Sequence, residues 1–444
     1  MASRTIRELT DRPKAEAARL GFDALGVAPA VPPPHYPDYL AWLSRGHAAG
    51  MGYLERHAAL REHPSRLLEG VRSVIVGMFV YGQRADDPEP TETQGKVARY
   101  ALGGDYHELL WSRLEALLEW LRSECPDVRG RAVADTAPLL ERDYAVLAGL
   151  GWIGKNTMLI HKRLGSYTVL GALLVDVELA YDEPPATGHC GTCTRCLEAC
   201  PTGAFVGPYE LDSRRCISYW TIEHRGPLPE EAAENLHGWA FGCDICQEVC
   251  PWNRKAPAGR EEALRPRPGA SRPDLIAWLE ADPADFARAL KGTALSRAKR
   301  AGLVRNAASL LGRRQVQQAT PALVRALDDP DPTVREAAAR ALARITGSDH
   351  QVDADHHRGR RDEDQQNQGA QPGGVGEDAA PGLVPRGGVH ETDRQGERQN
   401  VPVNVDPRHA APSRFSPALS APAAEGSPAS APSSSACAGP SRAS

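Results

Sequence analysis

Eight of the ten cysteines lie between His189 and Lys255, and their spacing constrains this chain more than any other feature. The first run has the pattern C-x2-C-x2-C-x3-C-P and ends at Pro201. This is the bacterial ferredoxin spacing for thiolate ligands of a [4Fe–4S] cluster. A second run, C-x2-C-x3-C-P, ends at Pro251, and its first cysteine is displaced upstream to Cys216. Eight thiolates suit two cubane clusters with four ligands each.

The ligands of the two clusters are expected to cross between the runs, because the fourth cysteine of such a run binds the other cluster. One cluster is therefore assigned to Cys190, Cys193, Cys196 and Cys250, and the second to Cys200, Cys216, Cys243 and Cys246. A disulfide framework is typical of small secreted chains, whereas this one has 444 residues and no secretory signal at its start. Structural zinc is the other alternative, but a third cysteine three residues after a C-x2-C pair fits one tetrahedral site poorly.

Length and composition set the remaining bounds. A chain of 444 residues predicts two to three domains. The net charge of −5 and the pI near 6.3 leave any nucleic-acid contact to a local basic patch. No run of about 18 apolar residues occurs, so no membrane span is expected. We therefore expect a cytoplasmic, reducing location and a monomer.

Residues 1–185 alternate helical and strand patterns, which predicts an α/β or α+β domain. Helices are expected at 6–20, 39–54, 106–121 and from Pro138 to Leu150. Strands are expected at 23–28, 73–81, 131–134 and 167–177, and a loop at 83–94. The run from Ser73 to Tyr81 is apolar throughout, which is typical of a strand buried on both faces.

Asp135 follows the short strand 131–134, at the end where open α/β sheets place ligands and chemistry. An aspartate just before a helix is also a common N-cap. If Pro138 is the first helical residue, however, the cap position falls on Ala137. Structural and functional roles both stay open for Asp135. Lys155, taken alone, would be an ordinary surface charge.

Gly149, Gly151 and Gly154 spell G-x-G-x-x-G, the dinucleotide-binding string. That motif requires a strand directly before it, and here a helix precedes it. Asp176 lies at the expected distance for the acidic partner, but within a strand that belongs to the core. We therefore reject a nicotinamide site and expect electrons to come from an external low-potential donor of the flavodoxin or ferredoxin type.

The cysteine-rich part, 186–258, is expected to form a ferredoxin-like domain, with 216–224 beside the second cluster. Residues 259–346 are expected to form a helical region, and DDPDPTVREAAARALARI resembles a HEAT-repeat helix. Its predicted helices are 303–311, 321–327 and 333–345. Basic residues gather before them, at Arg297, Lys299, Arg300 and Arg305, which are candidates for phosphate contacts. Residues 347–444 are rich in Gly, Pro, Ser and Ala, and we expect them to be disordered.

Taken together, these motifs resemble the epoxyqueuosine reductase family. The resemblance covers about residues 5–346. It rests on DTAPLLERDYAVLAGLGWIGKN from Asp135 to Asn156, on GSYTVLG, and on CGTCTRCLEACPTGA, CISYWTIEHRG and FGCDICQEVCPWN. The string R-x-K-R-x-G-L-x-R-N, ending at Asn306, completes it.

The resemblance implies reduction of epoxyqueuosine to queuosine in a tRNA anticodon loop, with cobalamin bound in the first domain. It implies Asp135 as the proton donor, and we hypothesise that desolvation beside the macrocycle holds its carboxyl group protonated. The resemblance implies that the family's cobalamin contacts correspond to Arg61, Ala98, Asp135, Lys155, Asn156, Leu159, Leu170, Ser218 and Asp244. We expect the tRNA contacts at His224, Arg297, Lys299, Arg300 and Arg305.

Three other functions share part of this pattern. A small-molecule corrinoid reductase of the reductive dehalogenase type shares the catalytic plan, but it typically has an export signal and lacks a basic helical cap. A two-cluster electron carrier without a substrate would not need a domain of 185 residues before the cysteines. A tRNA-binding scaffold would bind RNA without reducing the epoxide.

Overall fold

The computed structural model describes residues 6–82 and 89–347. Its central sheet has the strand order β1-β2-β7-β4. These strands are β1 (Ala24–Pro29), β2 (Ser73–Val80), β4 (Gly130–Val133) and β7 (Thr168–Val175). Every neighbouring pair in this sheet is antiparallel, so the domain is α+β rather than α/β. The rule that open α/β sheets bind ligands at the ends of their strands therefore does not explain the position of Asp135.

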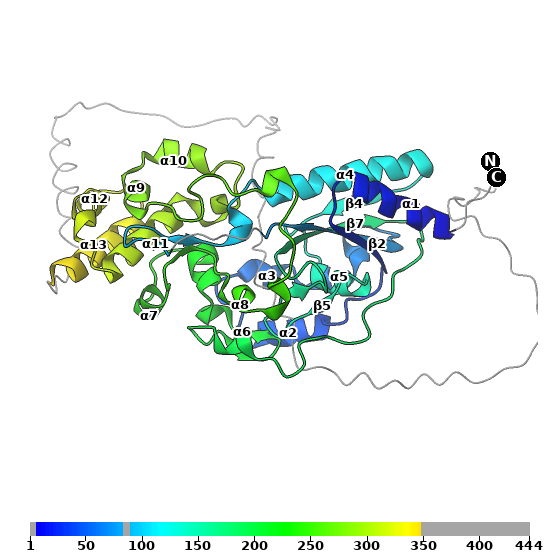
Figure 1. Cartoon of the computed structure of the whole chain (residues 1–444), viewed down its shortest axis with the longest axis horizontal. Coiled ribbons are helices and arrows are strands. Elements are labelled where there is room, and N and C mark those ends of the chain that lie inside the picture. Colours follow the sequence, from blue (N-terminus) through cyan, green and yellow to red (C-terminus); the bar gives the residue numbers. More distant parts are fainter. Residues whose placement is uncertain (1–5, 83–88, 348–444) are drawn as a thin grey trace, which may run out of the picture.

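Helices cover both faces of this sheet (Figure 1). One face packs against α4 (Tyr106–Glu124), with α1 (Ile6–Arg19) beside it, and the other packs against α5 (Glu141–Leu147). Strand β2 shows the reason, because Ile75 and Phe79 point toward α4 while Val76 and Met78 point toward α5. The prediction of a strand buried on both faces is confirmed.

Two helix predictions were wrong. The stretch 39–54 forms two helices, α2 (Tyr36–Ser44) and α3 (Gly52–Arg56). The chain breaks between them because Gly46 and Ala49 adopt positive φ angles of 68° and 53°. Helix α5 begins at Glu141 and not at Pro138, because the backbone turns at Asp135, whose φ is 54°.

The G-x-G-x-x-G string leads into a hairpin of β5 (Trp152–Ile153) and β6 (Leu159–Ile160). Gly151 has a φ of 148°, and a Cβ there would lie 2.3 Å from the carbonyl oxygen of Ile160. Glycine is needed for this close backbone approach and not for a pyrophosphate. The rejection of a dinucleotide-binding motif is consistent with this geometry.

The cysteine-rich part contains only short elements. They are α6 (Arg195–Glu198), β8 (Phe205–Gly207), β9 (Glu210–Leu211), α7 (Glu230–Glu234), β10 (Trp239–Phe241) and α8 (Ile245–Glu248). A π-helical turn spans Tyr219–Glu223, just after Cys216. Strand β10 pairs in parallel with β3 (Lys96–Val97), which ties this part to the first domain.

The helical part contains α9 (Leu275–Glu280), α10 (Pro283–Leu290), α11 (Lys299–Arg313), α12 (Thr320–Ala326) and α13 (Pro332–Thr346). The three predicted helices, 303–311, 321–327 and 333–345, are confirmed as α11, α12 and α13, and α12 ends one residue earlier than predicted. Figure 1 shows this part at the end of the molecule opposite α1. Gly312 lets α11 approach α13 closely, since a Cβ there would lie 2.5 Å from the Cα of Ala341.

The first core extends beyond the sheet. Leu264, Phe286 and Leu303 pack in the same buried cluster as α4, so residues from the helical part complete the core of the first domain. Within the described ranges, no helix is both long and apolar enough to cross a membrane. The tail beyond Gly347, predicted to be disordered, lies outside the described residues.

Candidate active site

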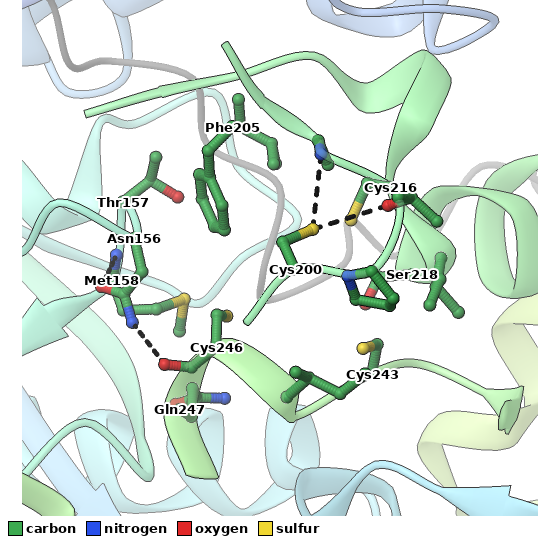
Figure 2. A pocket seen from close by; sticks show the side chains of 16 residues that line it. Asn156, Thr157, Met158, Cys200, Phe205, Cys216, Ser218, Cys243, Cys246 and Gln247 are labelled. Carbon is green, nitrogen blue, oxygen red and sulfur yellow. Dashed lines mark hydrogen bonds between the residues drawn. The ribbon is translucent and has the colours of Figure 1, made fainter. Parts of the chain in front are cut away.

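The eight cysteines form two groups of four, each around its own hollow. One hollow, which we call the outer site, is lined by Cys190, Cys193, Cys196 and Cys250. The other, the inner site, is lined by Cys200, Cys216, Cys243 and Cys246. Figure 2 shows the side chains of these last four around a common space. Each group takes a cysteine from both sequence runs, which is the crossed grouping that the spacing predicts.

The chemistry of these thiols fits iron–sulfur clusters. All eight are free thiols, which excludes disulfides among them. Burial raises the pKa of Cys196 to about 12 and that of Cys216 to about 11. Such buried thiols need a bound cationic metal group to be held as thiolates.

Lys155 and Asn156 connect the two sites. The Lys155 ammonium donates to the carbonyl oxygens of Gly191 and Cys193, at 2.7 and 3.0 Å. The Asn156 amide lines both hollows and donates to the carbonyl oxygen of Cys246 at 3.4 Å. Lys155 is therefore held against the loop of the outer site and is not an ordinary surface charge.

Asp135 lies among buried polar side chains that come from elsewhere in the sequence. The Tyr106 hydroxyl donates to its Oδ2 at 2.5 Å, and His107 Nε2 lies 3.5 Å from the same oxygen. Its backbone N–H donates to Glu141 Oε1 at 2.7 Å. The N-cap of α5 is Leu140, so the helix-cap alternative for Asp135 is wrong. The strained φ and these contacts are typical of a functional position.

Two neighbours of Asp135 carry protons at neutral pH. Burial disfavours the His107 imidazolium, but the hydrogen bond to Asp105 and the negative charge of Asp135 outweigh burial and raise the pKa of His107 to about 9. Asp105, the N-cap of α4, accepts from His107 Nδ1 at 2.6 Å. Burial, followed by the charge of Asp135, raises the pKa of Glu141 to about 8. Both side chains contact Asp135 and can act as proton sources beside it.

A chain of tyrosines links Asp135 to Asp244, which lies between two inner-site cysteines in the sequence. The Tyr100 ring packs against those of Tyr106, which donates to Asp135, and Tyr81, with centroids 6.0 and 6.3 Å away. The Gln247 amide, which lines the inner site, contacts both Tyr81 and Asp244. The Arg297 guanidinium lies 5.5 Å from the ring centroid of Tyr53. The polar region around Asp135 is thus continuous with the region beside the inner site.

Asp244 is fully buried, and its Oδ2 accepts the backbone N–H of Arg99 at 2.7 Å. Burial raises its pKa to about 7. Ala98 lies next to Asp244, because the Ala98 N–H donates to the carbonyl oxygen of Phe241.

Among the predicted cofactor contacts, Ser218 lines the inner site. Of the other predicted cofactor contacts, Leu159 and Leu170 pack in the hydrophobic cluster beneath α5.

Several buried polar atoms in this region lack a partner among the described residues, and such atoms normally have one. They include Tyr53 Oη, Tyr167 Oη and Thr157 Oγ1. A corrin ring carries amide groups around its rim, which can both donate and accept hydrogen bonds. The unpartnered atoms fit such a ligand better than they fit a purely apolar one.

The structure corrects the RNA-contact prediction for Arg305. This side chain is 1% exposed, and its guanidinium donates to the carbonyl oxygens of Trp220, His224 and Gly226. The neighbouring Asn306 amide donates to the carbonyl oxygens of Thr221 and Ala240. Because its donors are used inside the protein, Arg305 fastens α11 to the segment after Cys216 and does not face a ligand.

The other basic candidates differ in how freely they can meet a phosphate. The Arg297 guanidinium forms two hydrogen bonds to Glu223, and that of Arg300 pairs with Asp329. His224 Nε2 lies 2.9 Å from the carbonyl oxygen of Pro227. Lys299 is exposed and begins α11 with a positive φ of 59°. Of these four, Lys299 has the most accessible charge.

Sequence reasoning missed Tyr53, Tyr106, His107 and Glu141. The sequence places Tyr106 and His107 only at the start of a predicted helix. No motif joins them to Asp135, which lies 29 positions after Tyr106. An Asp-Tyr-His run at a helix start was the available signal, because the residue before a helix is often a side-chain cap.

Three family descriptions match the chain. One, 4Fe-4S double cluster binding domain, covers residues 189–253, and all eight cysteines of the two sites lie within it. Another, Epoxyqueuosine reductase QueG, DUF1730, covers residues 61–136, and HEAT repeats match residues 292–364. The epoxyqueuosine reductase of Cyclobacterium marinum is 40% identical over 303 residues, which are 68% of this chain and 96% of the relative. This chain belongs to the epoxyqueuosine reductase family.

Other members of the family agree. The Escherichia coli epoxyqueuosine reductase is 39% identical over 310 residues, covering 69% of this chain and 82% of that protein. A crystal structure of epoxyqueuosine reductase with an epoxyqueuosine-modified tRNA-Tyr stem loop is 31% identical, with a TM-score of 0.73 over 77% of this chain and 91% of that one. The Bacillus subtilis enzyme, solved with its aspartate-bearing catalytic loop swung out of the active site, is 30% identical, with a TM-score of 0.71 over the same shares.

Proposed function

We propose that this chain reduces epoxyqueuosine to queuosine in the anticodon loop of tRNA, the last step of queuosine formation. Family membership supports this reaction, and a related structure contains an epoxyqueuosine-modified tRNA stem loop. Within the chain, the observation that carries the proposal is Asp135, held by Tyr106 and His107 in a region continuous with the inner thiol site.

The cofactors that we propose are two [4Fe–4S] clusters and a cobalamin. The clusters would use the outer and inner groups of cysteines. The corrinoid would lie against Arg61, Ala98, Asp135, Lys155, Asn156, Leu159, Leu170, Ser218 and Asp244. When bound, it would supply a reducible cobalt centre that accumulates electrons arriving one at a time.

The reaction converts an epoxide to an alkene. It consumes two electrons and two protons, and the epoxide oxygen leaves as water. Asp135 is proposed to protonate the departing oxygen through its carboxyl group. His107, cationic at neutral pH and 3.5 Å from Asp135 Oδ2, is the adjacent group that can restore this proton. Tyr106 holds the same carboxylate oxygen in place.

His107→Gln is expected to slow epoxide reduction about tenfold or more at neutral pH, because Asp135 loses its nearest cationic neighbour. The wild-type rate should fall as the pH rises through about 9, where His107 loses its proton. The variant should not show this fall in rate near pH 9, and its remaining pH dependence should come from Glu141 and Asp105. Single-turnover rates from pH 6 to 10 test this expectation.

The same substitution provides a stability readout. The raised pKa of His107 contributes stability that is fully present below about 6.5, its unfolded value, and is lost as the pH rises through about 9. His107→Gln should therefore flatten the decline of the melting temperature across that window. If both pH profiles stay unchanged in the variant, His107 has no part in proton delivery.

Lys299→Glu is expected to weaken binding of the tRNA stem loop and to reduce the slope of log K against log salt by about 1, as for loss of one phosphate contact. Lys291→Glu is the matched control, because it makes the same charge change at another exposed position. Fluorescence anisotropy at several salt concentrations measures both. Equal weakening by the two variants would argue for a general charge effect and against a contact at Lys299.

The function itself is tested by anaerobic incubation of the reconstituted protein with epoxyqueuosine-containing tRNA, cobalamin and dithionite. Nucleoside mass spectrometry should show queuosine appearing as epoxyqueuosine disappears. RNA binding without loss of the epoxide would refute the proposed function.

A further inference from the structure

The outer thiol site lies close to the surface. Four neighbouring residues in its loop and helix start, namely Gly191, Thr192, Thr194 and Arg195, are exposed. The inner site is lined by buried residues such as Ser218, Ile217 and Leu211, and also by the exposed Pro201. The exposed residues around the outer site leave it within reach of a protein that delivers electrons.

The rim of the outer site is basic although the whole chain is acidic, with a net charge of −5. Gly165 lies against Asn253 and Ala256, and the Ser166 N–H donates to Asn253 Oδ1 at 2.7 Å. This contact brings the turn that contains Lys162 and Arg163 next to the segment that contains Arg254 and Lys255. All four of these side chains are exposed.

Aromatic rings connect this rim to the thiols. Trp252, which lines the outer site, lies 4.9 Å from Trp152 and 5.9 Å from His189 between ring centroids. Arg195 lines the same hollow and adds a further exposed cation. The nearby acid Glu198 accepts a hydrogen bond from Thr194, which directs its carboxylate along its own helix.

We propose that this rim, defined by Lys162, Arg163, Arg195, Arg254 and Lys255, is the docking surface for a small acidic electron-carrier protein. The proposal rests on the proposed function, which requires an external electron source. In each encounter one electron passes from the reduced carrier to the outer cluster. The carrier is oxidised by one electron, the cluster is reduced by one, and no bond is made or broken. Two encounters supply the two electrons of one turnover.

Charge and size both fit this partner. Opposite charges steer association and raise its rate most at low salt. Transient redox complexes have small interfaces, so a rim of a few exposed cations beside one cluster near the surface is sufficient. An RNA partner would use the same charges, and it is the alternative outcome of the test.

The test uses two double variants of the full chain with both clusters, Lys162→Glu/Arg163→Glu and Arg254→Glu/Lys255→Glu, and an acidic flavodoxin as the probe. Each variant should bind oxidised flavodoxin about tenfold more weakly at low ionic strength, measured by calorimetry. The difference should shrink as salt is added. Stopped-flow reduction of the clusters by reduced flavodoxin should slow in parallel. Arg122→Glu/Arg265→Glu, two exposed charges of the first domain and its neighbouring segment, is the control and should match wild type.

Dithionite separates this inference from the proposed function. As a small reductant it needs no docking surface, so queuosine formation with dithionite should be unchanged in both variants. Unchanged flavodoxin binding, or weakened tRNA binding with normal flavodoxin binding, would overturn the docking surface. If the wild type makes no queuosine with dithionite, the proposed function fails, while flavodoxin binding still reports on the rim.

Discussion

Asp135→Asn is expected to lower the rate of epoxide reduction by about 10²- to 10⁴-fold, the usual contribution of a general acid. The amide keeps the size of the side chain and can still accept the hydrogen bond from Tyr106. It cannot give a proton to the departing oxygen. Single-turnover assays with saturating tRNA, followed by nucleoside mass spectrometry, measure the loss.

Binding measurements show whether the lower rate comes from loss of the acid group or from weaker binding of cofactor or tRNA. Iron content, corrinoid uptake and tRNA affinity should be unchanged in Asp135→Asn. Asp127→Asn makes the same chemical change at an exposed position of the same domain and should keep full activity. Retained turnover in Asp135→Asn with normal corrinoid uptake would assign the acid role to another group, and Glu141 would be the first candidate because burial raises its pKa to about 8.

The second large effect concerns the two groups of four cysteines. Cys216→Ser is expected to lower the iron content from about eight to about four per chain, because a hydroxyl is a poor ligand for a [4Fe–4S] cluster. Turnover should fall below detection with any reductant, since Cys216 belongs to the inner site, which is continuous with the region of Asp135. Iron analysis and the visible absorption of the clusters measure the first effect.

Cys190→Ser is the matched variant, since Cys190 lines the outer site. It should lose a similar amount of iron, but it should keep part of its activity with dithionite, which can reach the inner cluster without a carrier. Turnover with reduced flavodoxin should be lost in both variants. Equal activity of the two variants with dithionite would contradict an order in which the outer cluster feeds the inner one.

Much of this protein was predictable because the informative residues are close in sequence. The cysteine spacing predicted the two groups of four, since ligands a few residues apart in a tight turn can reach one cluster. The apolar run from Ser73 to Tyr81 predicted a strand buried on both faces, and β2 is one. Helical periodicity likewise predicted α11, α12 and α13.

Helix boundaries were less predictable. The start of α5 depends on a single backbone turn at Asp135, and the break between α2 and α3 depends on Ala49 in a positive-φ conformation. Neither residue type favours that conformation strongly enough for the sequence to reveal it. Surrounding contacts, such as the hydrogen bond from Asp135 N–H to Glu141, stabilise these turns.

By itself, the sequence determined the family, the cluster ligands to test and the aspartate to test, because these depend on residue types at fixed short spacings. Only the tertiary structure decided what surrounds them. The pairing of β4 with β7, and the packing of α4 on that sheet, place Tyr106 and His107 against Asp135. The docking of α11 buries Arg305 and leaves Lys299 exposed. Contacts between distant segments follow from how whole faces pack, and the burial that results sets which charges are available for chemistry.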